Sequence, residues 1–242
     1  MSQLKNYIDK TLKDEYKEVK TLSETALNRL TVYEHCQTGK KVVLIRSLNR
    51  NDDVFRTLKS KDTMGLLPMI YEVCTEDDAL YVLEEYIEGE SLFKKYATSQ
   101  PESDELKMIL LSICDSMEIL HSLNIVHRDI KPNNIMVRRD GSICMVDLSI
   151  AKIITENSAR DTTTLGTVGY AAPEQFGVSQ SMPTVDIYAF GVLANQLALG
   201  VHPTTSVPKG KLGRIIKKCT STQISNRYQN ASQLKKAIRN IL

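Results

Sequence analysis

Hydrophobic and polar positions change their spacing along the chain after about one third of its length. In the first part, short apolar runs at residues 41–48 and 79–87 follow polar turn residues, and this pattern predicts two β-strands. Between these runs, residues 52–61 predict a short helix that Asn51 or Asp52 would cap. The first third of the chain is therefore predicted to be rich in β-structure.

The rest of the chain has mainly helical spacing. Apolar residues at intervals of three and four predict a buried helix of about five turns, formed around Leu106, Ile109, Leu110, Ile113, Met117 and Leu120. A short strand is predicted at 143–146 and a polar loop at 158–167, with helices after them. The sequence predicts an α+β protein with a small lobe of about residues 1–86 and a larger, mainly helical lobe of about residues 87–242.

Composition narrows the class of protein. The 242 residues contain 31 Lys and Arg against 29 Asp and Glu, so the net charge of +2 argues against nucleic acid or an anionic membrane as a partner. The hydrophobic share of 42% is typical of a globular protein and too high for a disordered one. The longest apolar stretch, residues 187–194, falls far short of the roughly 20 residues that span a bilayer.

Cysteine usage and the first residues predict a cytoplasmic location. The five cysteines are scattered and form no CxxC pair, as expected for reduced thiols rather than for disulfides or a zinc site. The first 20 residues are charged throughout and lack the apolar core of a signal peptide. We expect no attached membrane anchor or sensor domain, so that regulation acts through the polar loop, a separate regulator or a dimer.

Three polar motifs follow the long predicted helix. Residues 127–134 read HRDIKPNN, Asp147 follows the short predicted strand, and residues 166–174 read GTVGYAAPE. A carboxylate such as Asp129 is suited to orient a hydroxyl group and accept its proton. The oxygens of Asn134 and Asp147 are hard ligands of the kind that Mg²⁺ prefers.

These motifs, in this order, resemble those of eukaryotic-type serine/threonine protein kinases in their bacterial form. The resemblance extends from about residue 16 to residue 242. It implies a single bilobal kinase domain, with a small antiparallel β-sheet lobe and a larger helical lobe. It also implies transfer of the γ-phosphate of ATP to a serine or threonine hydroxyl of a protein substrate.

The resemblance assigns roles to five residues. Asp129 would be the catalytic base, and Lys131 would lie beside the transferred phosphate. Asn134 and Asp147 would hold Mg²⁺ together with the phosphates of ATP. Thr167 matches the threonine that packs beside the catalytic Asp and Lys in such kinases.

Other matches have supporting roles in the family. Asp186 resembles the buried aspartate that braces the catalytic loop, and Arg227 resembles the arginine that pairs with Glu174. Arg128 commonly binds a phosphorylated activation loop, for which the threonines at 162–164 are the candidate sites.

The small lobe departs from the family pattern at its phosphate-binding turn. Alignment with the glycine-rich loop places Ser23, Thr25 and Asn28 at the three glycine positions. Glycine there allows positive φ and a close approach of backbone N–H groups to phosphates. Ser23 and Asn28 are retained as candidate nucleotide-binding residues, and Asn tolerates unusual dihedral angles best.

The strand lysine and its helix partner are also altered. Alignment with the V-A-I-K strand places Leu44 at the Ala and Arg46 at the Lys, and these two positions share a face of the strand. Phe55 falls near the position of the helix glutamate. Glu85 and Ile87, after the second predicted strand, are the candidates for the hinge that contacts the nucleotide.

These departures leave two main hypotheses. The first is an active but atypical kinase that uses Arg46 or a nearby basic residue such as Arg29 to hold phosphate. The second is a pseudokinase, a binding or scaffolding module with weak or no ATP turnover. A small-molecule phosphotransferase of the same fold fits less well, because by resemblance it lacks the Ala-Pro-Glu segment and the lysine at 131.

Overall fold

The computed structural model describes residues 3–48, 51–155, 166–176 and 182–241. The chain divides into two compact units, an N-terminal unit of Met1–Glu88 and a C-terminal unit of Gly89–Leu242. The candidate phosphorylation sites at 162–164 lie outside the described residues. Within the described ranges, no helix combines the length and the apolar character needed to cross a membrane.

The N-terminal unit is built on one antiparallel sheet of five strands in the order β1-β2-β3-β5-β4. Its elements are α1 (Gln3–Glu15), β1 (Tyr16–Glu24), β2 (Asn28–His35), β3 (Lys41–Ser47), α2 (Asp52–Lys59), β4 (Ile70–Glu76) and β5 (Ala79–Glu85). The predicted strands at 41–48 and 79–87 and the predicted helix at 52–61 are confirmed as β3, β5 and α2. Neither candidate cap is confirmed, because Asn51 is the N-cap residue of α2 but its side chain makes no capping hydrogen bond, and Asp52 is the first helical residue.

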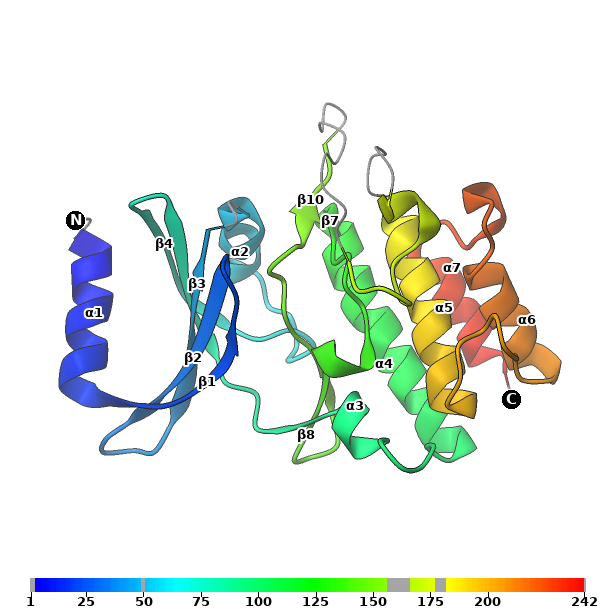
Figure 1. Ribbon diagram of the computed structural model, residues 1–242, viewed down its shortest axis with the longest axis horizontal. Helices are drawn as coiled ribbons and strands as arrows, with labels where there is room; N and C mark the ends of the chain where they lie inside the picture. Colours follow the sequence, from blue (N-terminus) through cyan, green and yellow to red (C-terminus); the bar gives the residue numbers. More distant parts are fainter. Residues whose placement is uncertain (1–2, 49–50, 156–165, 177–181, 242) are drawn as a thin grey trace. The chain divides into compact units, whose positions relative to one another are not determined.

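Helices α1 and α2 lie on opposite sides of this sheet (Figure 1). The buried side of α1 contributes Ile8 and Leu12, which pack with Val42 of β3 and Cys74 of β4. Because successive strand residues point to opposite faces, the face covered by α1 carries every second residue of β3. The sheet thus has one face covered by α1 and one covered by α2, which we call the α1 face and the α2 face. Because side chains alternate along a strand, residues two positions apart lie on the same face.

The C-terminal unit is mainly helical. It contains β6 (Gly89–Ser91), α3 (Leu92–Lys95), α4 (Ser103–Ser122), β7 (Ile125–Val126), η1 (Pro132–Asn134), β8 (Ile135–Arg138), β9 (Ile143–Met145), β10 (Lys152–Ile153), η2 (Pro173–Phe176), α5 (Pro183–Leu199), α6 (Gly210–Cys219), η3 (Ile224–Asn226) and α7 (Ala231–Arg239). The long predicted helix is confirmed as α4, and the predicted strand at 143–146 as β9. Together the two units have the α+β composition that the sequence predicts.

Helix α5 lies at the centre of the C-terminal unit. Twelve of its residues are buried, as expected for a helix that is apolar nearly all round rather than along one stripe. Helix α4 packs against α7, and α5 packs against α6 (Figure 1). Two small sheets, β7-β10 and β6-β8-β9, lie on this helical body, and residues 127–134, which we call the catalytic loop, connect β7 to β8.

Candidate active site

The start of the catalytic loop is held by a buried carboxylate of α5. Asp186 is completely buried, and its Oδ2 and Oδ1 accept hydrogen bonds from the backbone N–H groups of His127 (2.9 Å) and Arg128 (2.8 Å). His121, in the last turn of α4, also binds Asp186, with Nε2 at 3.0 Å from Oδ2. Since an ionised carboxylate only accepts, Nε2 is the donor. Three donors from two segments therefore converge on one side chain.

The charge on Asp186 is stabilised by these donors. Burial, the largest single influence, would by itself raise the pKa of this carboxyl group. The hydrogen bond from His121, the nearby imidazoles of His121 and His127 and the backbone N–H of His127 outweigh burial and lower the pKa below its ordinary value. Asp186 therefore braces the loop as a carboxylate, as the sequence predicts.

Asp129 lies in a compact hydrogen-bonded cluster. Its Oδ1 accepts from the hydroxyl group of Thr167 (2.7 Å), and its Oδ2 accepts from the ammonium group of Lys131 (2.6 Å). Lys131 also donates to the Thr167 hydroxyl at 2.8 Å. The Nδ2 of Asn134 donates to Oδ2 of Asp129 (3.1 Å) and to its backbone carbonyl (3.0 Å). The structure therefore brings together all four residues that the sequence nominates for the chemistry.

The two candidate metal ligands lie on adjoining backbone segments. The N–H of Val146 donates to the carbonyl of Asn134 at 2.9 Å, so Asp147 follows directly after a residue bound to Asn134. Asn134 uses Nδ2 as a donor to Asp129, which leaves its Oδ1 as a potential ligand atom. Asp147 adopts φ +67°, and its Oδ1 accepts from Ser149 N–H at 3.3 Å.

The side-chain oxygens of Asn134 and Asp147 suit one kind of metal ion. Among the described residues there is no cluster of three His, Cys, Asp or Glu side chains that would form an all-protein metal site. An amide oxygen and a carboxylate fit a hard divalent ion that completes its shell with water and phosphate oxygens. The residues present therefore fit a metal ion that arrives with a nucleotide.

The end of the 166–176 segment is anchored by an ion pair. Arg227 has only 2% of its surface exposed and binds Glu174 in a bidentate manner, at 2.5 and 2.9 Å. It also donates to the carbonyls of Thr184 (3.0 Å) and Ser221 (2.8 Å), and its guanidinium group lies 4.9 Å from the ring centroid of Tyr188. The predicted pairing of Arg227 with Glu174 is present, and its position makes it structural.

The hairpin at the predicted phosphate-binding turn closes without left-handed residues. None of Ser23, Thr25 and Asn28 has a positive φ. The backbone N–H and carbonyl of Asn28 bind Thr25, and the Asn28 side chain accepts from the hydroxyl of Ser47 at 2.5 Å. The Asn28 amide is thus used to join β2 to β3, while Ser23 lies beside an irregularity in β1.

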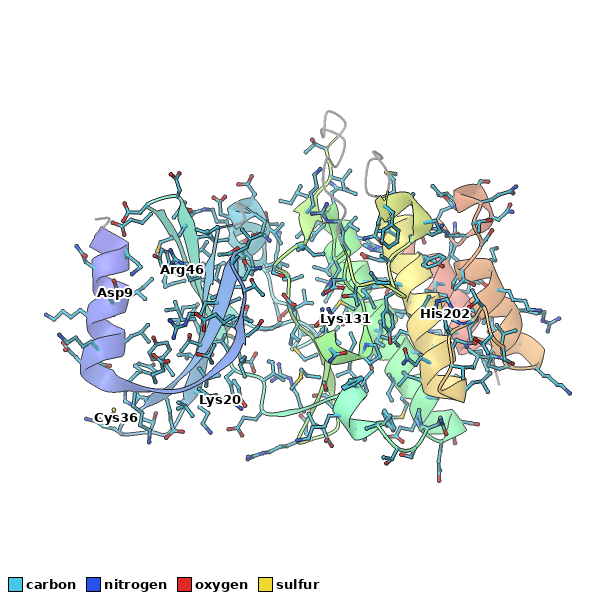
Figure 2. The ribbon with its side chains drawn as sticks, viewed as in Figure 1. Asp9, Lys20, Cys36, Arg46, Lys131 and His202 are labelled. Carbon is cyan, nitrogen blue, oxygen red and sulfur yellow. The ribbon has the colours of Figure 1, made fainter. Side chains whose placement is uncertain are left out.

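Strand β3 places Arg46 on the face of the sheet that α1 covers. Leu44 packs against the hydrophobic cluster that Ile8 and Leu12 of α1 form with the sheet. Arg46, two residues further on, is exposed and donates from Nε to the hydroxyl of Tyr81 at 3.4 Å (Figure 2). Tyr81 belongs to the same cluster, and the ammonium group of Lys5 in α1 lies 4.4 Å from its ring centroid. Leu44 and Arg46 do share a face, but it is the α1 face.

The α2 face of β3 is uncharged where the family places its lysine. By alternation this face carries Val43, Ile45 and Ser47, all of them buried. Phe55 of α2 is also buried, at 1% exposure. The expectation that Arg46 replaces the lysine opposite α2 is therefore corrected: parity showed which residues share a face, but not which face meets α2.

The changed position of Arg46 leads to a simple prediction. Replacing Arg46 by alanine is expected to change KM for ATP and kcat by no more than about twofold, as for most surface substitutions. Steady-state kinetics and the nucleotide-induced shift in melting temperature would measure this. A tenfold rise in KM for ATP would show instead that Arg46 holds the phosphates.

The two candidate hinge residues follow the end of β5. The N–H of Glu85 donates to the carbonyl of Met69 at 2.8 Å, and its carboxylate accepts from Met69 N–H at 3.2 Å. Ile87 is buried, at 6% exposure. Both the side chain and the backbone N–H of Glu85 are thus bound to the segment that precedes β4.

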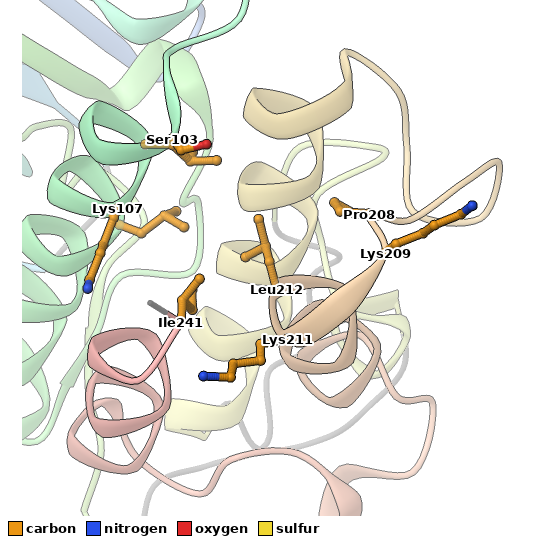
Figure 3. Close-up of a pocket in the computed structure, with 9 residues that line it drawn as sticks. Ser103, Lys107, Pro208, Lys209, Lys211, Leu212 and Ile241 are labelled. Carbon is orange, nitrogen blue, oxygen red and sulfur yellow. The ribbon is translucent and has the colours of Figure 1, made fainter.

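A separate cavity of about 290 Å³ lies in the C-terminal unit, away from the catalytic loop (Figure 3). It is formed by α4, by the start of α6 and by Ile241, and its lining is Ser103, Leu106, Lys107, Leu110, Pro208, Lys209, Lys211, Leu212 and Ile241. None of the residues that the sequence nominates for chemistry lines it.

Sequence reasoning missed two residues that support the site. His121 donates to Asp186, and Gln175 donates from Nε2 to the carbonyl of Arg128 at 3.1 Å. Each contact joins residues far apart along the chain. The position of His121 in the last turn of the long helix was the one available hint, and Gln175 had none.

The family model described as "Protein kinase domain" matches residues 67–242, more than half of the chain. The chain belongs to the protein kinase domain family. The predicted family and its α+β fold are confirmed, and membership implies the use of ATP and of a divalent metal ion. The match begins after β1, β2, β3 and α2, the elements around which the small lobe departs from the family pattern.

Several curated protein kinases are similar to this chain. The probable serine/threonine-protein kinase PknB of Lactococcus lactis is 26% identical over 94% of this chain and 42% of its own length. The serine/threonine-protein kinase pak-1 of Caenorhabditis elegans is 29% identical over 77% of this chain and 31% of its own length. PrkC of Bacillus subtilis is 36% identical over 55% of this chain and 21% of its own length. The chain thus spans less than half the length of these three relatives.

Proposed function

We propose that this kinase-family chain is a serine/threonine protein kinase that transfers the γ-phosphate of ATP to a protein hydroxyl group. The observation that carries the proposal is the cluster of Asp129, Lys131, Asn134 and Thr167, joined by hydrogen bonds of 2.6–3.1 Å. Such a cluster provides what phosphoryl transfer needs, a base and a positive charge in fixed positions. We further propose that the N-terminal and C-terminal units form one kinase domain.

Each residue of the cluster has a proposed task. Asp129 would orient the acceptor hydroxyl and take its proton, while Lys131 would neutralise charge on the transferred group. Thr167 holds Oδ1 of the Asp129 carboxylate, so that the carboxylate keeps one orientation. Asn134 and Asp147 would hold Mg²⁺, which supplies charge neutralisation to the phosphates of ATP.

The remaining parts of the proposal rest on the sequence. A protein substrate with serine or threonine, a cytoplasmic location, the absence of nucleic-acid and membrane partners, and a dimer or separate regulator all stay predictions. Ser23, Asn28, Glu85 and Ile87 remain the proposed nucleotide contacts of the N-terminal unit. Leu44 and Arg46 leave that set because they belong to the α1 face.

The proposal is tested by incubating the purified chain with radiolabelled ATP, Mg²⁺ and a serine- and threonine-rich acceptor protein. We expect label on the chain or the acceptor, in phosphoserine or phosphothreonine, and none after chelation of the metal ion. Background label in a folded chain that shows a nucleotide-dependent rise in melting temperature would point to a pseudokinase instead.

The metal assignment leads to a second expected result. Replacing Asp147 by asparagine should raise the Mg²⁺ concentration for half-maximal rate at least about tenfold, because a charged ligand is lost. The matched control is Asp140→Asn, in the turn between β8 and β9, where the carboxylate binds only Ser142 among the described residues. Equal Mg²⁺ requirements in the two variants would contradict the role of Asp147.

A further inference from the structure

Gln175 joins the end of the 166–176 segment to the catalytic loop through its side-chain amide. It lies in η2 with 8% of its surface exposed. Its Oε1 accepts from the N–H of Ala172 (2.9 Å), its own N–H donates to the carbonyl of Ala172 (2.9 Å), and its Nε2 donates to the carbonyl of Arg128 (3.1 Å). Both ends of the amide are therefore bound to backbone groups of two different segments.

The carbonyl that Gln175 binds has a defined direction. Arg128 has the left-handed φ of +69°, uncommon for a residue with a side chain, and its N–H is bound to Asp186. The peptide bond from Arg128 to Asp129 is thus fixed on both sides, by Asp186 before it and by Gln175 at its carbonyl oxygen. A shift of this carbonyl would move Asp129, which follows directly.

Gly166 lies directly against this bridge. A Cβ atom on Gly166 would stand 3.1 Å from Nε2 of Gln175, 3.3 Å from the Arg128 carbonyl oxygen and 2.9 Å from the Cβ of Ala171. Its φ of +116° also favours glycine. The chain can therefore pass close to the catalytic loop here, immediately before Thr167.

The turn after Gly166 carries Thr167 at one end and Ala172 at the other. The carbonyl of Thr167 accepts from the N–H groups of Tyr170 and Ala171, both at 3.0 Å. The hydroxyl of Thr167 binds Asp129 and Lys131. A closed turn bound to Gln175 at Ala172 is thereby also placed against the catalytic loop at Thr167.

We infer that Gln175 is a positioning residue for phosphoryl transfer: its amide fixes the turn 167–172 against the catalytic loop, so that the Thr167 hydroxyl keeps the Asp129 carboxylate in place. This inference rests on the proposed function. Gln175 acts through Thr167, because its amide binds Ala172 at the end of the turn that Thr167 begins, and the Arg128 carbonyl in the catalytic loop. The effect of removing its amide should therefore depend on whether Thr167 retains its hydroxyl group.

A double-mutant cycle tests this dependence. Gln175→Met should lower kcat about tenfold with KM for ATP within about twofold, because small displacements at a reacting centre are costly. In a Thr167→Ala background the same substitution should have little further effect. Gln175→Glu keeps the acceptor for Ala172 but loses the donor to Arg128, so it should behave like Gln175→Met.

Gln229→Met is the matched control. The Nε2 of Gln229 also bridges backbone carbonyls, of Ile224 (3.1 Å) and Arg227 (2.8 Å), but far along the chain from the catalytic loop. It should leave kcat unchanged within about twofold. Full additivity of Gln175→Met and Thr167→Ala would overturn the inference, because each residue would then act independently.

Amide hydrogen exchange provides a readout that does not need activity. Gln175→Met should speed exchange at the N–H groups of Tyr170 and Ala171, which bind Thr167 rather than Gln175. Exchange in α5 should not change. Unchanged exchange at Tyr170 and Ala171 would refute the inference even in an active kinase. If Gln175→Met speeds exchange at these N–H groups but the wild-type chain has no transferase activity, the proposed function is refuted while the contact of Gln175 with the turn is supported.

Discussion

Replacing Asp129 by asparagine is expected to lower the rate of phosphoryl transfer by about 1000-fold, since a positioned general base contributes roughly 100- to 10,000-fold. An amide has nearly the same size as the carboxylate but does not take the proton of the acceptor hydroxyl. The measurement is incorporation of label from ATP into the chain and the acceptor protein, compared with the wild type at equal concentration.

The hydrogen bonds around Asp129 allow this variant to fold. The amide oxygen can keep the place of Oδ2 and accept from Lys131 and Asn134, while the amide nitrogen faces the Thr167 hydroxyl, which is able to accept. The melting temperature should therefore stay close to that of the wild type. A folded Asp129→Asn variant that keeps more than a tenth of the wild-type rate would contradict the assignment of the base.

The catalytic loop was predictable because the residues that characterise it are contiguous in the sequence. Residues 127–134 and Asp147 belong to neighbouring strands and loops, so their spacing along the sequence largely determines their proximity in the fold. Helix α4 was predictable because its apolar residues repeat at helical spacing over five turns. These parts depend on local sequence, which a single chain reveals.

The N-terminal unit was less predictable, because the wrong expectation about Leu44 and Arg46 concerns tertiary packing. Among the side chains of α1 that the structure describes, Ile8 and Leu12 are the buried apolar ones, too few for a clear periodic signal. Alternation along β3 correctly groups Leu44 with Arg46, but the packing of α1 decides which way that pair faces. Local patterns fix relative parity, whereas the choice of face depends on residues far away in the sequence.

Gln175 shows the same limit in the C-terminal unit. Its partner is the backbone carbonyl of Arg128, 47 positions earlier. Any residue type provides a carbonyl, so no residue at position 128 signals the contact. Side-chain contacts to backbone groups of this kind are found from coordinates. In an ion pair such as Glu174 and Arg227, by contrast, the types of both residues indicate the contact.

Replacing Arg227 by methionine is expected to destabilise the C-terminal unit by about 3–5 kcal/mol, the usual cost of removing one partner of a buried ion pair. Methionine keeps much of the aliphatic volume, so the loss comes from charge and hydrogen bonds. Glu174 would keep a charge with only 13% of its side chain exposed, and the carbonyls of Thr184 and Ser221 would each lose a donor. Equilibrium unfolding followed by helical circular dichroism would measure the change.

Two further variants separate the buried pair from an ordinary surface pair. Lys95→Met breaks the partly exposed pair between Lys95 and Glu105 (2.8 Å) and should cost no more than about 1 kcal/mol. Adding Glu174→Met to Arg227→Met should restore part of the lost stability, because the unpaired buried charge is then removed. It should not restore all of it, since the carbonyls of Thr184 and Ser221 still lack the donors that Arg227 supplied. If Arg227→Met costs no more than Lys95→Met, the contact with Glu174 does not anchor the 166–176 segment.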